Sequence, residues 1–180
     1  MKTSRTNLPS SSLLNVYNKE YKHIDSFQGV IHDKENKFTA TDMGMAFFSS
    51  GPKWVEYLFA LRNKIVSIFG LKTSDPIKNR TEQLENFNCD VGAQLGLFKV
   101  LAKTENEIIL GEDDKHLNFR VSLFLHLQVE DTTTKAFIIS TLVAFNNRLG
   151  KLYFLIVNPF HKLIIPIMLK GIIKELEKQN

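Results

Sequence analysis

The sequence has little cysteine, and this scarcity excludes several classes of protein. Its 180 residues include a single cysteine, Cys89, so no intramolecular disulfide can form, as is usual in a reducing compartment. A catalytic cysteine would need a histidine partner, and no sequence motif identifies one. We therefore expect Cys89 to be an ordinary thiol that is buried or half-buried.

Metal-binding patterns are missing as well. No two histidines have the His-x-x-x-His spacing, and none of them lies in a cysteine cluster. The five histidines are His23, His32, His116, His126 and His161. We predict no metal site, no cofactor and no catalytic residue that a motif would identify.

Neither strong charge nor a targeting segment marks the chain. The formal net charge of +4 is too small to indicate nucleic-acid binding, and no arginine-rich stripe or aromatic RNA-binding signature accompanies it. Residues 1–12 lack the apolar core of about seven to fifteen residues that a secretory signal needs. The sequence thus predicts a cytoplasmic protein that does not bind nucleic acid.

Long uninterrupted apolar runs are also absent. The most apolar stretch, residues 152–173, is interrupted by Asn158, Pro159, His161, Lys162, Pro166 and Lys170. A membrane-spanning helix needs about twenty mostly apolar residues with few or no charges. We therefore predict no transmembrane segment.

What the chain does have is a globular composition that is rich in phenylalanine. Hydrophobic residues make up 43%, charged residues 23%, and there are 14 phenylalanines. A chain of this length can form one domain and bury most of its apolar surface without metals or disulfides. Residues 1–20 are small and polar, so we predict a flexible leader there and a single domain over residues 21–180.

The start of that domain predicts one strand and one short helix. Residues 24–31 are suited to a strand, and residues 33–36 to a polar turn. Thr39 or Thr41 can then cap a helix over residues 42–49, whose first turn is favoured by an acidic residue, Asp42.

A second helix is predicted over residues 52–69. Ser50-Gly51-Pro52 supplies a capping residue and a proline suited to the first helical turn. Gly70 provides a stop signal, and residues 72–88 are polar enough for a surface loop. One apolar stripe repeats at spacings of three and four along the helix: Trp54, Leu58, Leu61, Ile65 and Ile68.

Extended runs follow, separated by short polar segments of the length that hairpins require. These predicted strands are residues 93–102, 107–111, 117–129, 135–145 and 151–157. Together with residues 24–31 they predict an antiparallel sheet of about six strands. The thirteen residues 117–129, at roughly 3.3 Å each, would form a strand about 43 Å long. We therefore expect the sheet to curve around another element of the fold.

The run 117–129 alternates between two faces. Its odd-numbered residues are all apolar, and its even-numbered residues include Arg120, Phe124 and His126. We expect the odd-numbered face to be buried and the even-numbered face to be mostly wet. Phe124 indicates that the leader or a second subunit covers part of the wet face.

We predict a last helix with Asn158 as its cap, and we expect the curved sheet to pack around this helix. We expect Lys162, Pro166, Lys170 and Lys174 to face water. The residues expected against the sheet are Phe160, Ile164, Ile167, Met168 and Gly171. The lysines would also suit a helix on a membrane surface, but the apolar side is needed to close the sheet, which favours the solvated face of a core helix.

This order of elements resembles the helix-grip fold of the START-like superfamily, which includes birch-pollen-type allergens, lipid-transfer domains and polyketide cyclases. More specifically, the amino-acid sequence resembles a bacterial family of unknown function within or close to that superfamily. The resemblance runs from about Leu8 to the end and rests on Pro52-Lys53-Trp54, Leu61-Arg62, Phe69-Gly70-Leu71-Lys72, Gly111-Glu112-Asp113-Asp114, Leu117-Asn118-Phe119-Arg120 and Asn158-Pro159-Phe160-His161. It implies an α+β fold in which a curved antiparallel sheet is covered by a long C-terminal helix.

The resemblance also implies that an apolar molecule binds between the sheet and the terminal helix. We therefore expect the partner to be a hydrophobic small molecule or lipid, bound mainly by apolar burial. The expected lining is Trp54, Leu58, Phe119, Val121, Phe137, Ile139, Phe160, Ile164 and Met168.

Two alternatives stay open. The same cavity could serve a cyclase, dehydratase or hydrolase, which would need at least two of His161, Arg120 and the acids near Glu112 to converge as acid and base. If the even-numbered face of residues 117–129 were the concave one, Arg120 and His126 would be polar groups of the pocket. In the other alternative phenylalanine side chains fill the space, and the chain is a protein-interaction domain that could form a homodimer.

Overall fold

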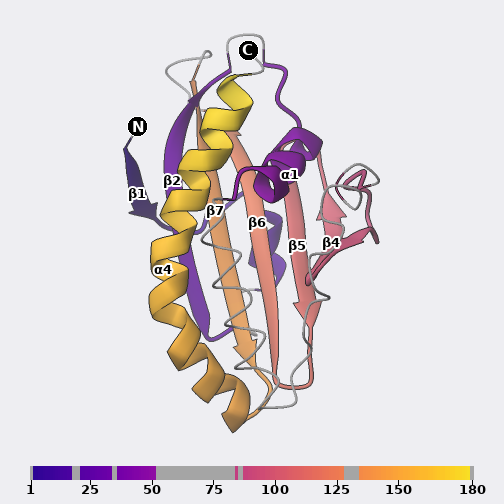
Figure 1. Cartoon of the computed structure of the whole chain (residues 1–180), viewed down its shortest axis with the longest axis vertical. Helices are drawn as coiled ribbons and strands as arrows, with labels where there is room; N and C mark the ends of the chain where they lie inside the picture. Colours follow the sequence, from indigo (N-terminus) through magenta and orange to yellow (C-terminus); the bar gives the residue numbers. More distant parts are fainter. Residues whose placement is uncertain are drawn as a thin grey trace.

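The computed structural model describes residues 2–17, 21–33, 36–51, 84, 87–127 and 134–178. Over these residues the protein is an α+β domain built on one open antiparallel sheet (Figure 1). The sheet has seven strands in the order β1-β2-β7-β6-β5-β4-β3. The antiparallel sheet and the long C-terminal helix are therefore as predicted, with seven strands in place of about six.

The elements have these bounds. The strands are β1 (Thr3–Thr6), β2 (His23–His32), β3 (Gln94–Leu95), β4 (Phe98–Lys103), β5 (Glu107–Asp113), β6 (Leu117–Leu127) and β7 (Thr134–Phe145). The helices are the short 3-10 helix η1 (Leu13–Val16) and the α-helices α1 (Ala40–Ser49) and α4 (Arg148–Glu177). The predicted helix over residues 52–69 lies outside the described residues.

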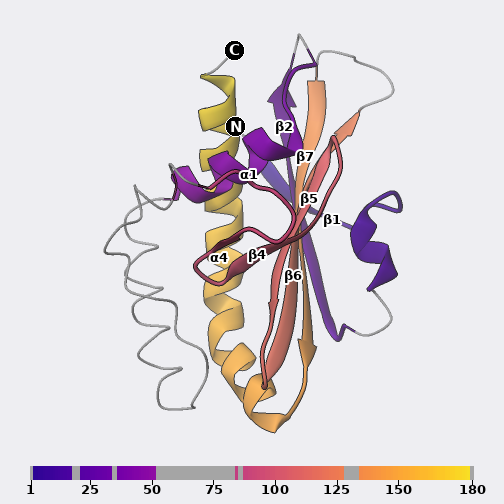
Figure 2. The ribbon, with the colours of Figure 1, turned by 90° about the vertical axis from the view of Figure 1, so that its right-hand side faces the viewer.

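Helices cover the two faces of the sheet unequally. Figure 2 shows α1 and α4 on one face, which we call the helix face, and η1 on the opposite face. β6 and β7 pair in register, with Val121 opposite Thr141 and Leu123 opposite Ile139. Because side chains alternate along a strand, these four residues all point to the helix face.

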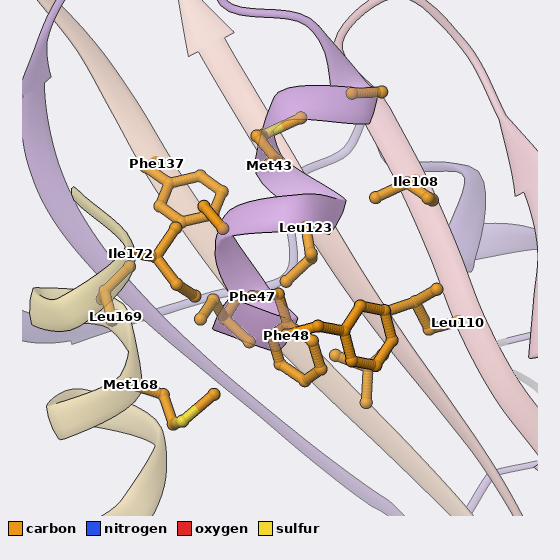
Figure 3. Packing of buried hydrophobic residues seen from close by; sticks show 14 of the residues in the cluster. Met43, Phe47, Phe48, Ile108, Leu110, Leu123, Phe137, Met168, Leu169 and Ile172 are labelled. Carbon is orange, nitrogen blue, oxygen red and sulfur yellow. The ribbon is translucent and has the colours of Figure 1, made fainter. Parts of the chain in front are cut away.

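The main core lies on the helix face. Val121, Leu123 and Leu125 from β6 pack there with α1 and α4, which confirms the predicted burial for these three odd-numbered residues, whereas Leu117 and Phe119 are half-buried. Figure 3 shows Met43, Phe47 and Phe48 of α1 in this core, where α1 lies over the sheet beside α4.

A reciprocal cap fixes the start of α1. The side chain of Asp42 accepts the Thr39 backbone N–H at 2.8 Å, and Thr39 Oγ1 accepts the Asp42 N–H at 3.3 Å. This capping box satisfies donors that a helix N-terminus otherwise leaves unpaired. Of the two predicted caps, Thr39 and Thr41, the structure has Thr39.

The even-numbered residues of β6 were predicted to be wet, and this prediction is wrong for Arg120, Ser122 and Phe124, which are buried. For Arg120 and Ser122 the cause is the N-terminal segment. Leu14 of η1 packs with Tyr21, Ile109 and Leu142 on this face. Phe124 belongs to a separate cluster with Ala136 and Ile138.

The predicted flexible leader contributes regular elements to the fold. β1 pairs with β2 at the edge of the sheet. The carboxylate of Glu107 anchors η1, since it accepts the Ser12 hydroxyl at 2.5 Å and the Leu13 N–H at 2.8 Å. These elements could not be predicted from their short polar sequences, because contacts with distant residues of β2 and β5 stabilise them.

The predicted strand over residues 151–157 is wrong, because α4 already begins at Arg148. Asn147 is the cap, and its side chain accepts the Gly150 N–H at 3.0 Å. The run that follows is apolar on every side, and such a pattern does not distinguish a strand from a helix. Asn158 and Pro159 consequently lie within the helix and do not open it.

The side of α4 that faces the sheet also differs from the prediction. Of the expected residues Met168 is buried and Ile164 is half-buried, whereas Phe160 and Ile167 are exposed. Lys162, Lys170 and Lys174 are exposed, as predicted. The residues of α4 in the main core are Ile164, Ile165, Met168, Leu169, Ile172, Ile173 and Leu176.

Candidate functional site

A buried polar cluster lies between the sheet and the middle of α4. Asp25 of β2 is at its centre, with a side chain that is only 5% exposed. His23 Nε2 and His161 Nδ1 each lie 3.3 Å from the same oxygen, Asp25 Oδ2. The cluster therefore joins β2 to α4 through one carboxylate.

Strand register brings a further polar group to the same place. Asp25 is opposite Thr141 of β7, so the side chains of both residues point to the helix face. Asn158 and His161 lie one turn apart on α4 and therefore share a side of that helix. We call the residues His23, Asp25, Thr141, Asn158 and His161 the polar cluster.

Four buried polar atoms of this cluster have no hydrogen-bond partner within the described parts of the chain: Asp25 Oδ1, Thr141 Oγ1, Asn158 Oδ1 and His161 Nδ1. The contact of His161 Nδ1 with Asp25 is thus an ion-pair contact without hydrogen-bond alignment. Leaving a buried polar atom unpaired costs about 1–3 kcal/mol, and such atoms are few in native proteins. Their concentration at one place marks a candidate site.

Electrostatic attraction determines the charge of Asp25. Burial by itself raises the pKa of this carboxyl, but the contacts with His161 and His23 outweigh it and hold the pKa below its ordinary value. Asp25 is therefore an anion at neutral pH. It can accept hydrogen bonds and orient an imidazole, but it has no proton to donate.

Apolar side chains surround the cluster. The ring of His23 contacts Phe154 with centroids 4.6 Å apart, and Phe154 in turn contacts Phe145 at 5.3 Å. Two of the predicted lining residues, Phe119 and Ile164, are half-buried hydrophobic residues at the margin of the main core. The arrangement is a small polar patch in an otherwise apolar sheet–helix interface.

The predicted cavity residues are distributed between core and surface. Val121, Phe137, Ile139 and Met168 are buried between the sheet and the helices, and Phe160 is 42% exposed. Trp54 and Leu58 lie outside the described residues. By their position, Phe119, Ile164 and these four buried residues are therefore candidates for the apolar lining of a binding site.

The predicted polar pocket groups do not converge. His161 belongs to the polar cluster, whereas Arg120 lies on the opposite face of the sheet, with its guanidinium 5.4 Å from the Tyr17 ring. His126 is exposed and lies beside Phe124. Glu112 contacts Gln94 of β3 at 3.3 Å, near the far edge of the sheet.

Arg120 has a structural partner instead. It pairs with Asp113 of β5 at 2.8 Å. Burial tends to lower the pKa of Arg120, but Asp113 and the two tyrosines beside it raise it overall. The guanidinium is a fixed cation that holds the β5–β6 hairpin and the N-terminal segment together.

Cys89 is fully buried, as predicted. Burial, as the main cause, raises the pKa of its thiol to about 11, so the thiolate that nucleophilic chemistry needs is scarce at neutral pH. In the described ranges no group of three or more His, Cys, Asp and Glu residues is arranged to hold a metal ion.

Sequence reasoning missed His23, Asp25, Thr141 and Asn158. The sequence did contain one signal for Asp25. Like Phe27 and Ile31, Asp25 is an odd-numbered residue of an apolar strand, so its acidic side chain points to the buried face. The contribution of Asn158 was hidden because it was interpreted as a cap, and that of Thr141 because a threonine in a strand is ordinary.

Together the fold and the cluster define an α+β domain with an open antiparallel sheet, a long C-terminal helix and a polar patch enclosed between them. The chain belongs to the family described as "Protein of unknown function (DUF2867)", which matches residues 18–168. No curated protein and no solved structure matches the chain.

Proposed function

We propose that this protein is a START-like binding domain that holds a small apolar molecule with one polar end between the sheet and α4. The polar end would contact the polar cluster, and the apolar part would lie along Phe119, Val121 and Ile164. The observation that carries the proposal is a set of four buried atoms that have no hydrogen-bond partner among the described residues, on Asp25, Thr141, Asn158 and His161.

The chemistry of the cluster favours a particular kind of polar end. Asp25 Oδ1 and Asn158 Oδ1 only accept hydrogen bonds, and Asp25 carries a negative charge. A hydroxyl, amide or amine can donate to these atoms, whereas a carboxylate would be repelled by Asp25. We therefore expect apolar alcohols and amines to bind more tightly than fatty acids of equal chain length.

The experiment starts from protein purified without detergent. Native mass spectrometry should detect a co-purified small molecule, or a dodecanol or dodecylamine adduct that forms when the compound is added. Displacement of an apolar fluorescent dye gives the affinities. Tighter binding of dodecanol than of dodecanoic acid supports the proposal; capture of neither the dye nor any of these compounds would exclude it.

A second candidate function, an acid–base enzyme, is favoured by one observation. Asp25 lies within 3.3 Å of nitrogen atoms of two histidines, and a carboxylate beside an imidazole orients it for proton transfer. The mass of the recovered ligand separates the two functions. A binding domain returns its ligand unchanged, whereas an enzyme returns a product whose formation stops in a His161→Gln variant.

A further inference from the structure

The exposed side of α4 carries a stripe of large apolar residues. We call Leu152, Leu155, Ile156, Phe160, Leu163 and Ile167 the outer stripe; these side chains are between 39% and 65% exposed. They recur at spacings of three and four and so share one side of the helix. At 1.5 Å per residue the stripe is about 22 Å long.

The other side of the same helix is already occupied. Ile165, Met168 and Leu169 are buried in the main core against the sheet. α4 is therefore apolar on two sides, although packing on the sheet explains only one of them. A contiguous apolar surface of this kind marks a binding site for a membrane or another protein.

Charge indicates which partner fits. Residues 148–174 of α4 include Arg148, Lys151, Lys162, Lys170 and Lys174 and contain no acidic residue. Arg148, Lys151, Lys162 and Lys170 are exposed around the stripe. The ion pairs among described residues do not involve Lys151, Lys162 or Lys170. An apolar stripe with a cationic rim is complementary to a bilayer that contains anionic lipid.

A second copy of the chain is a poorer fit. Antiparallel pairing of two outer stripes about their midpoint would place Arg148 of one copy opposite Lys170 of the other. Like charges in such contact are unfavourable. An anionic lipid surface meets the same rim with opposite charge.

We propose that the outer stripe of α4 docks this protein on the surface of an anionic lipid membrane. The helix lies parallel to the bilayer, its stripe enters the boundary between headgroups and acyl chains, and Lys151 and Lys162 contact lipid phosphates. By length and composition α4 could also cross a membrane, but its sheet-facing residues are held in the core. This proposal is independent of the small-molecule ligand.

Vesicle flotation tests the proposal with the full chain. Phosphatidylcholine vesicles with and without phosphatidylglycerol serve as the probe. We expect the wild type to float with the anionic vesicles and to bind them less at high salt. Leu155→Ser with Leu163→Ser should weaken binding at least about tenfold. Lys151→Gln with Lys162→Gln should weaken it by roughly fivefold per charge on anionic vesicles only.

Matched controls lie elsewhere on the surface. Val16 is 82% exposed on η1, and Lys22, just before β2, and Lys99 of β4 are exposed as well. Val16→Ser and the pair Lys22→Gln with Lys99→Gln should leave flotation unchanged. Circular dichroism and the melting temperature of every variant verify the fold.

Two results would overturn the proposal. The first is a wild type that does not bind anionic vesicles, or a Leu155→Ser with Leu163→Ser variant that floats like the wild type. The second is a sedimentation experiment in which the leucine variants dissociate a dimer while vesicle binding is absent, because the stripe would then be occupied by a second copy.

Discussion

His161 Nδ1 and Asp25 Oδ2 are 3.3 Å apart, although one lies in the middle of the last helix and the other near the start of the second strand. The pair ties α4 to β2 at the place where four polar atoms lack a partner among the described residues. The stability of the fold and the proposed ligand recognition therefore involve the same few side chains, and substitution can separate the two roles.

Asp25→Asn should destabilise the protein in a pH-dependent manner. The folded-state pKa of Asp25 is lowered from 3.8, so its ionisation stabilises the fold above about pH 4, and this contribution is lost as the pH falls through the folded-state value. We expect a loss of about 1–3 kcal/mol at pH 6. Urea unfolding of both proteins at pH 6 and pH 3 measures it, and a difference that grows on acidification would contradict this assignment.

Arg120→Lys should weaken the fold and leave ligand binding unchanged. The arginine pairs with Asp113 and lies beside the rings of Tyr17 and Tyr21. A lysine keeps the charge but loses the planar contacts. We expect a loss of about 1–2 kcal/mol in thermal unfolding. A change in dye affinity without a change in stability would show that Arg120 reaches the ligand.

Ser12→Ala should loosen the N-terminal segment alone. The Ser12 hydroxyl donates to Glu107, which also accepts from Ser122 at 2.6 Å. Removing the hydroxyl leaves a buried carboxylate oxygen with fewer donors, at a cost of about 1–2 kcal/mol. Hydrogen exchange should become faster in residues 8–17 while β6 and β7 stay protected. Uniform acceleration across the sheet would mean that the segment is not a separate unit.

Gly150→Ala tests the observed start of α4. A Cβ at this position would lie 2.0 Å from the backbone oxygen of His116. In an ordinary helix the change from glycine to alanine stabilises by about 1 kcal/mol, but here the backbone would have to shift, at a cost of about 1–3 kcal/mol. A lower melting temperature confirms the close approach, and a higher one would contradict it.

The sequence predicted the elements whose signals are local. The buried odd-numbered residues in the middle of β6 and a cap at Thr39 are predicted from neighbouring residues, and both agree with the structure. Residues 151–157 were misassigned because an all-round apolar run fits strand and helix alike. Because α4 is apolar on two sides, the sequence likewise did not determine which side of the helix faces the sheet.

The candidate site depended on information that is not local. The burial of Arg120 and Ser122 follows from η1, whose contacts join residues far apart in the chain. Asp25, Thr141 and His161 meet only through strand register and helix packing. A single sequence contains the residue types of such a cluster but not their proximity.

Thr141→Val offers the most direct test of ligand binding at the polar cluster. The buried Thr141 hydroxyl has no partner among the described residues, so an apolar replacement of similar shape should stabilise the protein by about 1 kcal/mol. If the hydroxyl recognises a ligand, the same change weakens binding by about 2- to 12-fold. Ser140→Ala is the control, because Ser140 bonds Ser26 at 2.8 Å on the other face.

The decisive measurement is therefore dodecanol affinity by dye displacement, taken together with the unfolding free energy, for the wild type, Thr141→Val and Ser140→Ala. We predict that Thr141→Val is more stable and binds more weakly, while Ser140→Ala is less stable and binds normally. Equal affinity in all three proteins would contradict ligand recognition by the polar cluster.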